Sequence, residues 1–224
     1  MSGCVQHLVQ SRRHRRLVRC EVQELSIKLQ DAITQLYDVS VVQGKATSTK
    51  RLDVLAEFCV QELERRGMSG ALTDQDIPGG GRTKNWDVTW NYDAKFRLAI
   101  SLKSLLKNVA GTVPNRIDDL MGEITNAQLY SPEIVLGYLM VFDTSNDSHS
   151  PKHGMNWIEV LRTRLERLSG RSPPHWTTGT IESHLLVAVD FSNGPELVSS
   201  ATDCDPFFDS LASQVRLRNP NALH

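Results

Sequence analysis

Two consecutive runs of alternating residues, between Asn85 and Lys103, constrain the fold of this chain more than any other feature. Both runs alternate apolar and polar side chains, which is the period of a half-buried strand. The short polar break Asp93-Ala94-Lys95 separates them and predicts an antiparallel hairpin. We expect one face to carry the apolar residues of both strands, which are Trp86, Val88, Trp90 and Tyr92, followed by Phe96, Leu98, Ile100 and Leu102.

The other face of this hairpin gathers polar residues of three kinds. With a three-residue loop, Asp87 lies opposite Ser101, and Lys103 lies one diagonal step away on the same face. A change of one residue in the loop would shift this register. The face would then combine a carboxylate, a hydroxyl and an ammonium group.

This combination is suited to metal-assisted cleavage of a phosphodiester. The Asp87 carboxylate and the backbone carbonyl of Leu102 are hard oxygen ligands for Mg²⁺, and Lys103 can orient or help deprotonate the attacking water. Here the chain resembles the PD-(D/E)XK nuclease superfamily, which includes most restriction endonucleases. The resemblance lies in Asp87 of NWDVTW, in the Ser101-Leu102-Lys103 triplet of AISLKS, and in the following segment RIDDLMGE. It implies that Asp87 is the first acid of the motif, that Lys103 is its lysine, and that the cofactor is Mg²⁺.

Two positions depart from the family pattern. Trp86 stands where the proline would be, and Ser101 stands where the second acid would be. Because a serine carries no negative charge for a metal, either the site is inactive or an acid comes from elsewhere. Some restriction endonucleases of this superfamily have a serine in the triplet and take a glutamate from the next helix. This chain resembles them.

The next helix is expected from about Asn115, as its N-cap, to Tyr130, and it carries Asp118, Asp119 and Glu123. We select Glu123 as the second metal-binding acid, with Asp119 as the alternative. Acids on an amphipathic helix are also commonly no more than its solvated face. In the selected arrangement Asp87, Glu123 and the Leu102 carbonyl hold the metal, Lys103 acts on the water, and Ser101 supports them.

Basic and polar residues flank this site on both sides. A glycine run, which we interpret as a flexible loop, precedes Arg82 and Lys84, and both side chains can meet a DNA backbone without reading its sequence. Lys107, Asn108 and Arg116 follow the hairpin and are further expected phosphate contacts. The partner implied is double-stranded DNA.

The composition is that of a soluble globular protein, with 40% hydrophobic and 23% charged residues. The net charge of −1 argues against a protein that coats DNA without specificity, but a nuclease needs only a local basic cleft. We expect one domain over residues 1–224. It divides into N-terminal helices (1–67), a catalytic core (68–143) and a helix-strand-helix segment that completes the sheet (144–224).

The four cysteines show no spacing typical of a zinc site or of a disulfide framework, which favours a reducing, cytoplasmic location. No apolar run approaches the roughly 18 residues of a membrane span. The first 20 residues contain five arginines and no acid. We interpret them as the start of the first helix, able to touch phosphates, rather than as an organelle transit segment.

Elsewhere the sequence predicts helices and strands in an order similar to that of the PD-(D/E)XK core. The fold class expected is α/β, with a central mixed sheet that contains the antiparallel hairpin and is flanked by helices. Helices are expected at about 15–37, 50–66, 156–169 and 207–217, a weak strand within 69–77, a strand buried on both faces at 133–143, and another strand at 181–191.

Three functional hypotheses remain open at this point. The first is a Mg²⁺-dependent endonuclease that cuts double-stranded DNA, similar to a type II restriction enzyme and acting as a homodimer because such enzymes commonly read two-fold symmetric sites. The second keeps the fold but makes the protein an inactive DNA-binding or assembly module. The third is an unrelated α/β protein in which Asp87 and Lys103 form an ordinary ion pair.

Overall fold

A six-stranded sheet forms the centre of the computed structural model, which describes residues 26–174, 176–198 and 204–223. The strands are adjacent in the order β1-β2-β3-β4-β7-β8, with β1–β2–β3 and β7–β8 antiparallel and β3–β4–β7 parallel. The prediction of an α/β fold with a mixed sheet and an antiparallel hairpin is confirmed. The bounds are Leu72–Ile77 (β1), Lys84–Tyr92 (β2), Lys95–Leu105 (β3), Val135–Asp143 (β4), Ser183–Asp190 (β7) and Glu196–Leu197 (β8).

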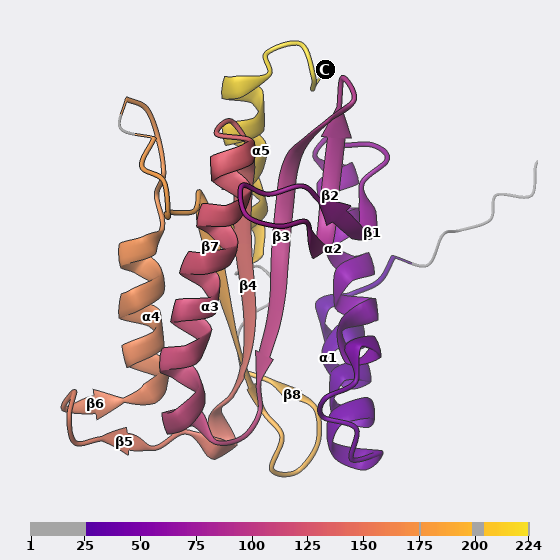
Figure 1. The fold of residues 1–224 in the computed structure, drawn as a ribbon. Coiled ribbons are helices and arrows are strands. Elements are labelled where there is room, and N and C mark those ends of the chain that lie inside the picture. Colours follow the sequence, from indigo (N-terminus) through magenta and orange to yellow (C-terminus); the bar gives the residue numbers. More distant parts are fainter. Residues whose placement is uncertain (1–25, 175, 199–203, 224) are drawn as a thin grey trace, which may run out of the picture.

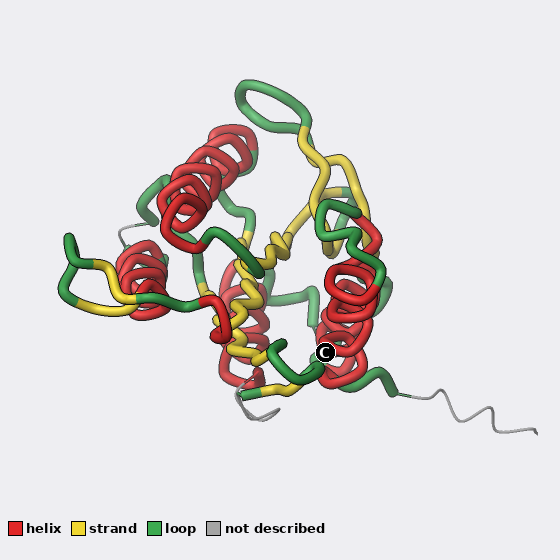
Figure 2. Tube along the Cα trace, turned by 90° about the horizontal axis from the view of Figure 1, so that it is seen from below, coloured by secondary structure: helices red, strands yellow, loops and turns green. Residues whose placement is uncertain are grey.

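Helices cover both faces of the sheet (Figures 1 and 2). Helices α1 (Leu29–Tyr37), α2 (Asp53–Arg65) and α5 (Asp205–Arg218) bury their apolar sides in one hydrophobic cluster with Val88, Ile100 and Leu139. Helices α3 (Val109–Tyr130) and α4 (Trp157–Leu168) pack in a second cluster on the opposite face with Leu136, Tyr138 and Met140. The two faces of the sheet are therefore covered by different helices. Helix α3 covers the face on which the candidate site described below lies.

Strand β4 is the central element, and all nine of its residues are buried. Its nearly continuous apolar sequence predicts this position, since a parallel strand covered by helices on both faces has no solvated side. Gly137 on this strand has no room for a larger side chain, because a Cβ there would lie 2.9 Å from Leu211 Cδ1 and 3.0 Å from Phe207 Cζ. Helix α5 thus approaches the backbone of β4 closely.

The hairpin has the expected register but a different loop. Its turn is two residues, Asp93 and Ala94, both with positive φ, rather than the three expected. An irregularity between Trp90 and Asn91 restores the predicted pairing beyond it, so that Val88 pairs with Ile100.

Two aromatic residues do not lie where strict alternation places them. Val88 and Trp90 belong to the cluster with α2, but Trp86 and Phe96 pack in the cluster with α3. Phe96 lies past the irregularity, which reverses the alternation. Trp86 lies beyond the last recorded β2–β3 pair, where the partner strand no longer fixes the face that its side chain meets.

Several helix boundaries also differ from the prediction. Helix α1 begins at Leu29, and the basic segment before it lies outside the described residues. The loop expected after Tyr37 begins with a π-helical turn, Asp38–Val42. Helix α2 is preceded by a 3₁₀ turn, Thr49–Leu52, and ends before Gly67, which has the positive φ expected of a C-terminal cap.

Helix α3 begins at Val109, six residues before the expected start, and contains Pro114. Asn108, not Asn115, occupies the N-cap position, in a left-handed conformation. The expected start at Asn115 is therefore wrong.

The C-terminal half follows the predicted order of helix, strand and helix. Helix α4 starts directly after Asn156, although the side chain of Asn156 makes no capping hydrogen bond. The segment between β4 and α4 contains a 3₁₀ turn, Thr144–Asn146, and the short strands β5 (His149–Ser150) and β6 (Met155–Asn156), which pair with each other. No helix within the described part of the chain has the length and hydropathy required to cross a bilayer.

Candidate functional site

The candidate site lies where β2 and β3 separate. The recorded ladder between these strands ends at Val88 and Ile100, and the next residues toward the open end are Asp87 and Ser101. Asp87 Oδ2 accepts a hydrogen bond of 2.7 Å from the backbone N–H of Leu102. The carboxylate is therefore held against β3.

Strand β3 contributes the rest of the expected triplet. Lys103 Nζ donates a hydrogen bond of 2.7 Å to Ser101 Oγ and lies 3.8 Å from Asp87 Oδ2. The side chains of Ser101 and Lys103 are on the same face of β3, as residues two apart in a strand must be. The structure thus brings Asp87 and Lys103 to the same side of the sheet.

Helix α3 supplies the second carboxylate. Ser101 Oγ donates a hydrogen bond of 3.1 Å to Glu123 Oε2, and Lys103 Nζ lies 3.8 Å from the same oxygen. Only 10% of the Glu123 side chain is exposed, which is not the environment of a solvated helix face. The alternative acid, Asp119, is 54% exposed and pairs with Arg116 at 3.3 Å. Of these two acids, Glu123 is the one in contact with Ser101 and Lys103.

A second lysine completes the cluster. Lys84 Nζ lies 2.5 Å from Glu123 Oε1, so each oxygen of Glu123 faces a different cation. Two carboxylates and two ammonium groups, from β2, β3 and α3, are thus gathered in one place. Their formal charges balance.

Burial changes the acidity of two groups in this region. The loss of solvent around Asp87 raises the pKa of its carboxyl, and Lys103 together with the Leu102 N–H opposes this shift. Burial also raises the pKa of Tyr138 on β4, with Glu123 adding to the effect. The Tyr138 phenol is therefore neutral at physiological pH.

The few oxygen ligands that the site offers fit Mg²⁺ better than a metal that is coordinated entirely by protein side chains. In the described residues, no group of three or more His, Cys, Asp or Glu side chains is placed to hold a metal. Mg²⁺ commonly binds through one or two carboxylates and keeps several waters. Asp87 and Glu123 offer such a pair. Because the Leu102 N–H faces Asp87, and a strand residue directs its N–H and C=O to the same side, the Leu102 carbonyl faces this region too.

The five residues expected to contact DNA differ in solvent exposure. The side chains of Arg82, Lys107 and Asn108 are exposed near the ends of β2 and β3. Lys84 is largely buried in its ion pair with Glu123, and 30% of Arg116 is exposed beside Asp119. Lys84 is therefore a member of the charged cluster rather than a free surface cation.

The glycine run before Lys84 is held against α3, contrary to the prediction of a flexible loop. The side chain of Asn126 accepts hydrogen bonds from the N–H groups of Gly81 and Arg82 and donates one to the Arg82 carbonyl. The Gly80 N–H also donates to the backbone carbonyl of Asn126. These contacts fix the entry of β2, and with it Lys84.

Residues not selected from the sequence also reach this region. Arg51 donates a hydrogen bond of 3.1 Å to Ser104 Oγ, next to Lys103, and its charge interacts with those of Arg116 and Asp87. Tyr138 pairs with Ser101 in the β3–β4 ladder. Strand periodicity indicates neither residue, because Arg51 precedes a helix and Tyr138 is one residue of a fully apolar run.

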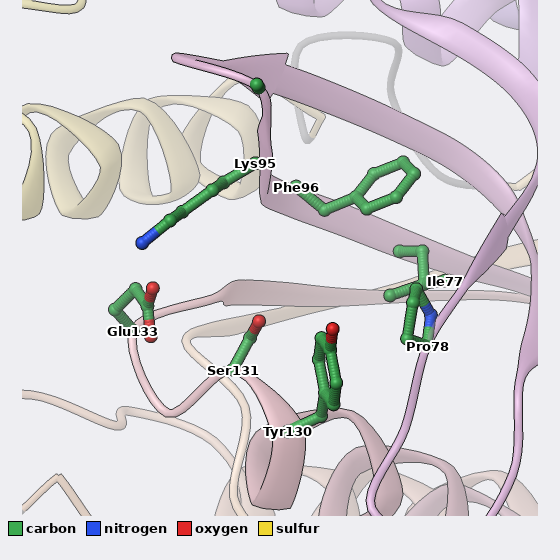
Figure 3. A pocket seen from close by; sticks show the side chains of 8 residues that line it. Ile77, Pro78, Lys95, Phe96, Tyr130, Ser131 and Glu133 are labelled. Carbon is green, nitrogen blue, oxygen red and sulfur yellow. The ribbon is translucent and has the colours of Figure 1, made fainter.

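Two cavities border the hairpin. One, of about 460 Å³, is lined by Asn85 and Asp87 of β2, by Lys50 of the 3₁₀ turn and by Asp53 at the start of α2. A second, of about 380 Å³, lies between the hairpin turn and the end of α3 (Figure 3). Figure 3 shows Lys95 and Glu133 at one end of it and Phe96, Ile77 and Pro78 at the other. Only the first cavity includes a residue of the charged cluster.

No protein-family model and no curated protein matches this chain. Among solved structures, the chain is similar to the small subunit of the heterodimeric restriction endonuclease R.BspD6I, with 8% identity and a TM-score of 0.34. The alignment covers 87% of this chain and 100% of that subunit. The function proposed below depends on the geometry of the site and not on this similarity.

Proposed function

We propose that this protein is a Mg²⁺-dependent endonuclease that hydrolyses phosphodiester bonds in double-stranded DNA. The observation that carries the proposal is the position of Lys103, with its ammonium 3.8 Å from both Asp87 and Glu123. Two acids that share a metal, next to a lysine that faces the same point, are the groups required to bind a cation and to direct a water molecule.

In this proposal Asp87, Glu123 and the Leu102 carbonyl would hold Mg²⁺, which when bound would activate a water molecule as a Lewis acid and neutralise phosphate charge. Lys103 orients the attacking water and stabilises the negative charge that develops on the phosphate. As the oxygen of this water forms its bond to phosphorus, one phosphodiester P–O bond breaks. The attacking water gives up a proton to solvent, and the departing oxygen takes one.

Ser101 has a positioning role in the same scheme. Its hydroxyl accepts a hydrogen bond from Lys103 and donates one to Glu123. It thereby fixes the distance between the lysine and the helix carboxylate. A serine is suited to this because a hydroxyl both donates and accepts, which a carboxylate does not.

Two exposed cations, Arg82 and Lys107, and the partly exposed Arg116 support the choice of DNA as substrate. Arg82, Lys107 and Arg116 lie on segments that border the site, where they can contact phosphates on either side of the cut. A homodimer would place two such sites on the two strands of a symmetric sequence. Light scattering of the protein with and without a DNA duplex tests this assembly.

One observation favours a second function, that of an inactive DNA-binding or assembly module. Both oxygens of Glu123 already face lysines, and the cluster is neutral without a metal. Such an arrangement would also stabilise a fold that has lost its cation.

Incubation of supercoiled plasmid with Mg²⁺ separates the two functions. We expect the wild type to cut the plasmid, and Asp87→Asn, Lys103→Met and Glu123→Gln to lower the rate at least about 100-fold. Asp119→Asn, one helical turn from Glu123, is the matched control and should retain activity. DNA binding without cleavage by the wild type would support the inactive module, and sequencing of the cut ends would give the site.

A further inference from the structure

Tyr138 lies beside the charged cluster on the strand next to it. In the parallel ladder between β3 and β4, Tyr138 pairs with Ser101, and both belong to the face covered by α3. The residue is 1% exposed. Its ring is therefore enclosed between the sheet and α3.

Within the described residues the Tyr138 hydroxyl makes no hydrogen bond, and it is not among the unpartnered atoms that are fully buried, so it keeps slight access to solvent. Buried tyrosine hydroxyls nearly always have one, because an unsatisfied buried polar group is costly. The charges of Glu123, Arg116, Asp119 and Asp87 act electrostatically on the phenol. A polar group held among charges without a bond to any of them is available to a ligand.

Arg116 also has a donor without a hydrogen-bond partner in the described structure. It lies two helical turns before Glu123, and residues seven apart share one face of a helix. Its Nη1 pairs with Asp119, whereas its Nε is buried and without a partner in the described structure. The phenol and the guanidinium interact electrostatically with each other. Two donors without a partner in the described structure, one on β4 and one on α3, thus interact with each other and belong to residues that act on Glu123 or lie on its helix face.

We propose that the Tyr138 hydroxyl, together with Arg116 Nε, donates hydrogen bonds to the non-bridging oxygens of the phosphodiester held at the Asp87–Glu123 site. This inference rests on the proposed nuclease function and adds a phosphate-binding residue to it. A neutral phenol suits this position because it donates to an anion without adding a further cation to Lys84, Lys103 and Arg116.

The test is the conservative substitution Tyr138→Phe, which removes only the hydroxyl. Tyr130→Phe, at the exposed C-terminal end of α3, is the matched control. We expect Tyr138→Phe to lower the single-turnover cleavage rate with Mg²⁺ at least about tenfold. The melting temperature should stay equal or rise, since a hydroxyl without a partner stabilises nothing when buried.

Phosphorothioate substrates give a readout that a purely structural role would not affect. Replacing either non-bridging oxygen by sulfur at the cut gives two diastereomers, of which one lacks the oxygen that Tyr138 contacts. On that diastereomer the wild type and Tyr138→Phe should react at equal rates. The proposal would be overturned if Tyr138→Phe cleaved as fast as Tyr130→Phe, or if its rate fell equally on both diastereomers. A melting temperature of Tyr138→Phe below that of the wild type would also overturn it.

Failure of the nuclease function itself would be visible separately. If the wild type does not cut DNA with Mg²⁺, binding of a short duplex in Ca²⁺ replaces the rate measurement. Several-fold weaker binding by Tyr138→Phe than by Tyr130→Phe would then support the phosphate contact. Equal binding by the two variants would overturn it.

Discussion

The Ser101 hydroxyl on β3 donates a hydrogen bond of 3.1 Å to Glu123 Oε2 on α3, a residue 22 positions further along the chain. Ser101, which stands where the family pattern has an acid, is thus in direct contact with the Glu123 carboxylate of α3. Ser101 also accepts a hydrogen bond from Lys103, so one hydroxyl connects the lysine to the acid. The consequence is a defined distance between Lys103 and Glu123 despite their origin on different elements.

Removal of this connection should affect activity more than stability. Ser101→Ala leaves the strand intact but removes the hydroxyl between Lys103 and Glu123. We expect the cleavage rate to fall about 10- to 100-fold while the free energy of unfolding falls by about 1–2 kcal/mol. A cleavage time course measures the change in rate, and urea unfolding measures the change in the free energy of unfolding. A change in stability alone would show that Ser101 does not position these groups.

The ion pair between Lys84 and Glu123 should compete with the metal. Lys84 Nζ lies 2.5 Å from Glu123 Oε1, where it occupies an oxygen that a cation would use. We expect Lys84→Met to lower the Mg²⁺ concentration for half-maximal cleavage about 3- to 10-fold, since it removes a largely buried competing charge. Lys95→Met, which changes an exposed lysine at the hairpin turn, should leave this concentration unchanged.

The glycine run should tolerate substitution at one position and not at another. A Cβ on Gly79 would lie 2.0 Å from Asn126 Nδ2 and 2.5 Å from the Arg82 carbonyl oxygen, whereas one on Gly81 would lie 3.5 Å from Asn126 Oδ1. We expect Gly79→Ala to reduce the free energy of unfolding by about 1–3 kcal/mol and Gly81→Ala to change it little. Chemical denaturation of both variants checks this, and equal stabilities would contradict the fixed loop.

A buried ion cluster just before β7 should be sensitive to loss of its acid. The fully buried carboxylate of Glu182 pairs with Arg171 at 3.1 Å and Arg218 at 2.5 Å. Glu182→Gln would leave two buried guanidinium groups without an anion, at a cost of about 3–5 kcal/mol. Glu196→Gln, at an exposed position on β8, is the control. Similar unfolding free energies for the two variants would contradict this account.

His184 should make stability depend on pH. Burial lowers the pKa of its imidazole, an effect that Glu166 opposes and Arg162 strengthens, and the ring lies 2.8 Å from Ser169 Oγ. Because the folded state disfavours protonation, the stability that the neutral ring contributes is present above its ordinary pKa and is lost as the pH falls below about 6.5. We expect the melting temperature to fall more for the wild type than for His184→Asn between about pH 7.5 and pH 5.5. Parallel curves would refute this.

The sequence predicted those features that depend on local periodicity. The alternation in β2 and β3 gave the hairpin, and the continuous apolar run gave the buried strand β4. The register was right even though the loop was wrong, because the irregularity after Trp90 offsets the shorter turn. Ser101 contacts Glu123 and not Asp119, whereas the role of Glu123 as a metal ligand, the metal and the substrate remain predictions.

Features that depend on distant contacts were not predictable in this way. The glycine run suggested flexibility, but its structure depends on Asn126, which lies on another element. The helix that carries Glu123 was expected to start at Asn115, but α3 starts at Val109 and contains Pro114. Tyr138 is hidden in a run where every residue is apolar or buried, so no pattern distinguishes it from its neighbours.

Divalent-cation binding tests the central claim most directly, because the account requires Asp87 and Glu123 to bind one ion together. Titration of Mn²⁺, followed by electron paramagnetic resonance of the free ion, measures this without DNA. We predict one site per chain in the wild type and in Asp119→Asn, and its loss or at least about tenfold weakening in Asp87→Asn and Glu123→Gln. Equal Mn²⁺ binding by all four folded proteins would contradict the account.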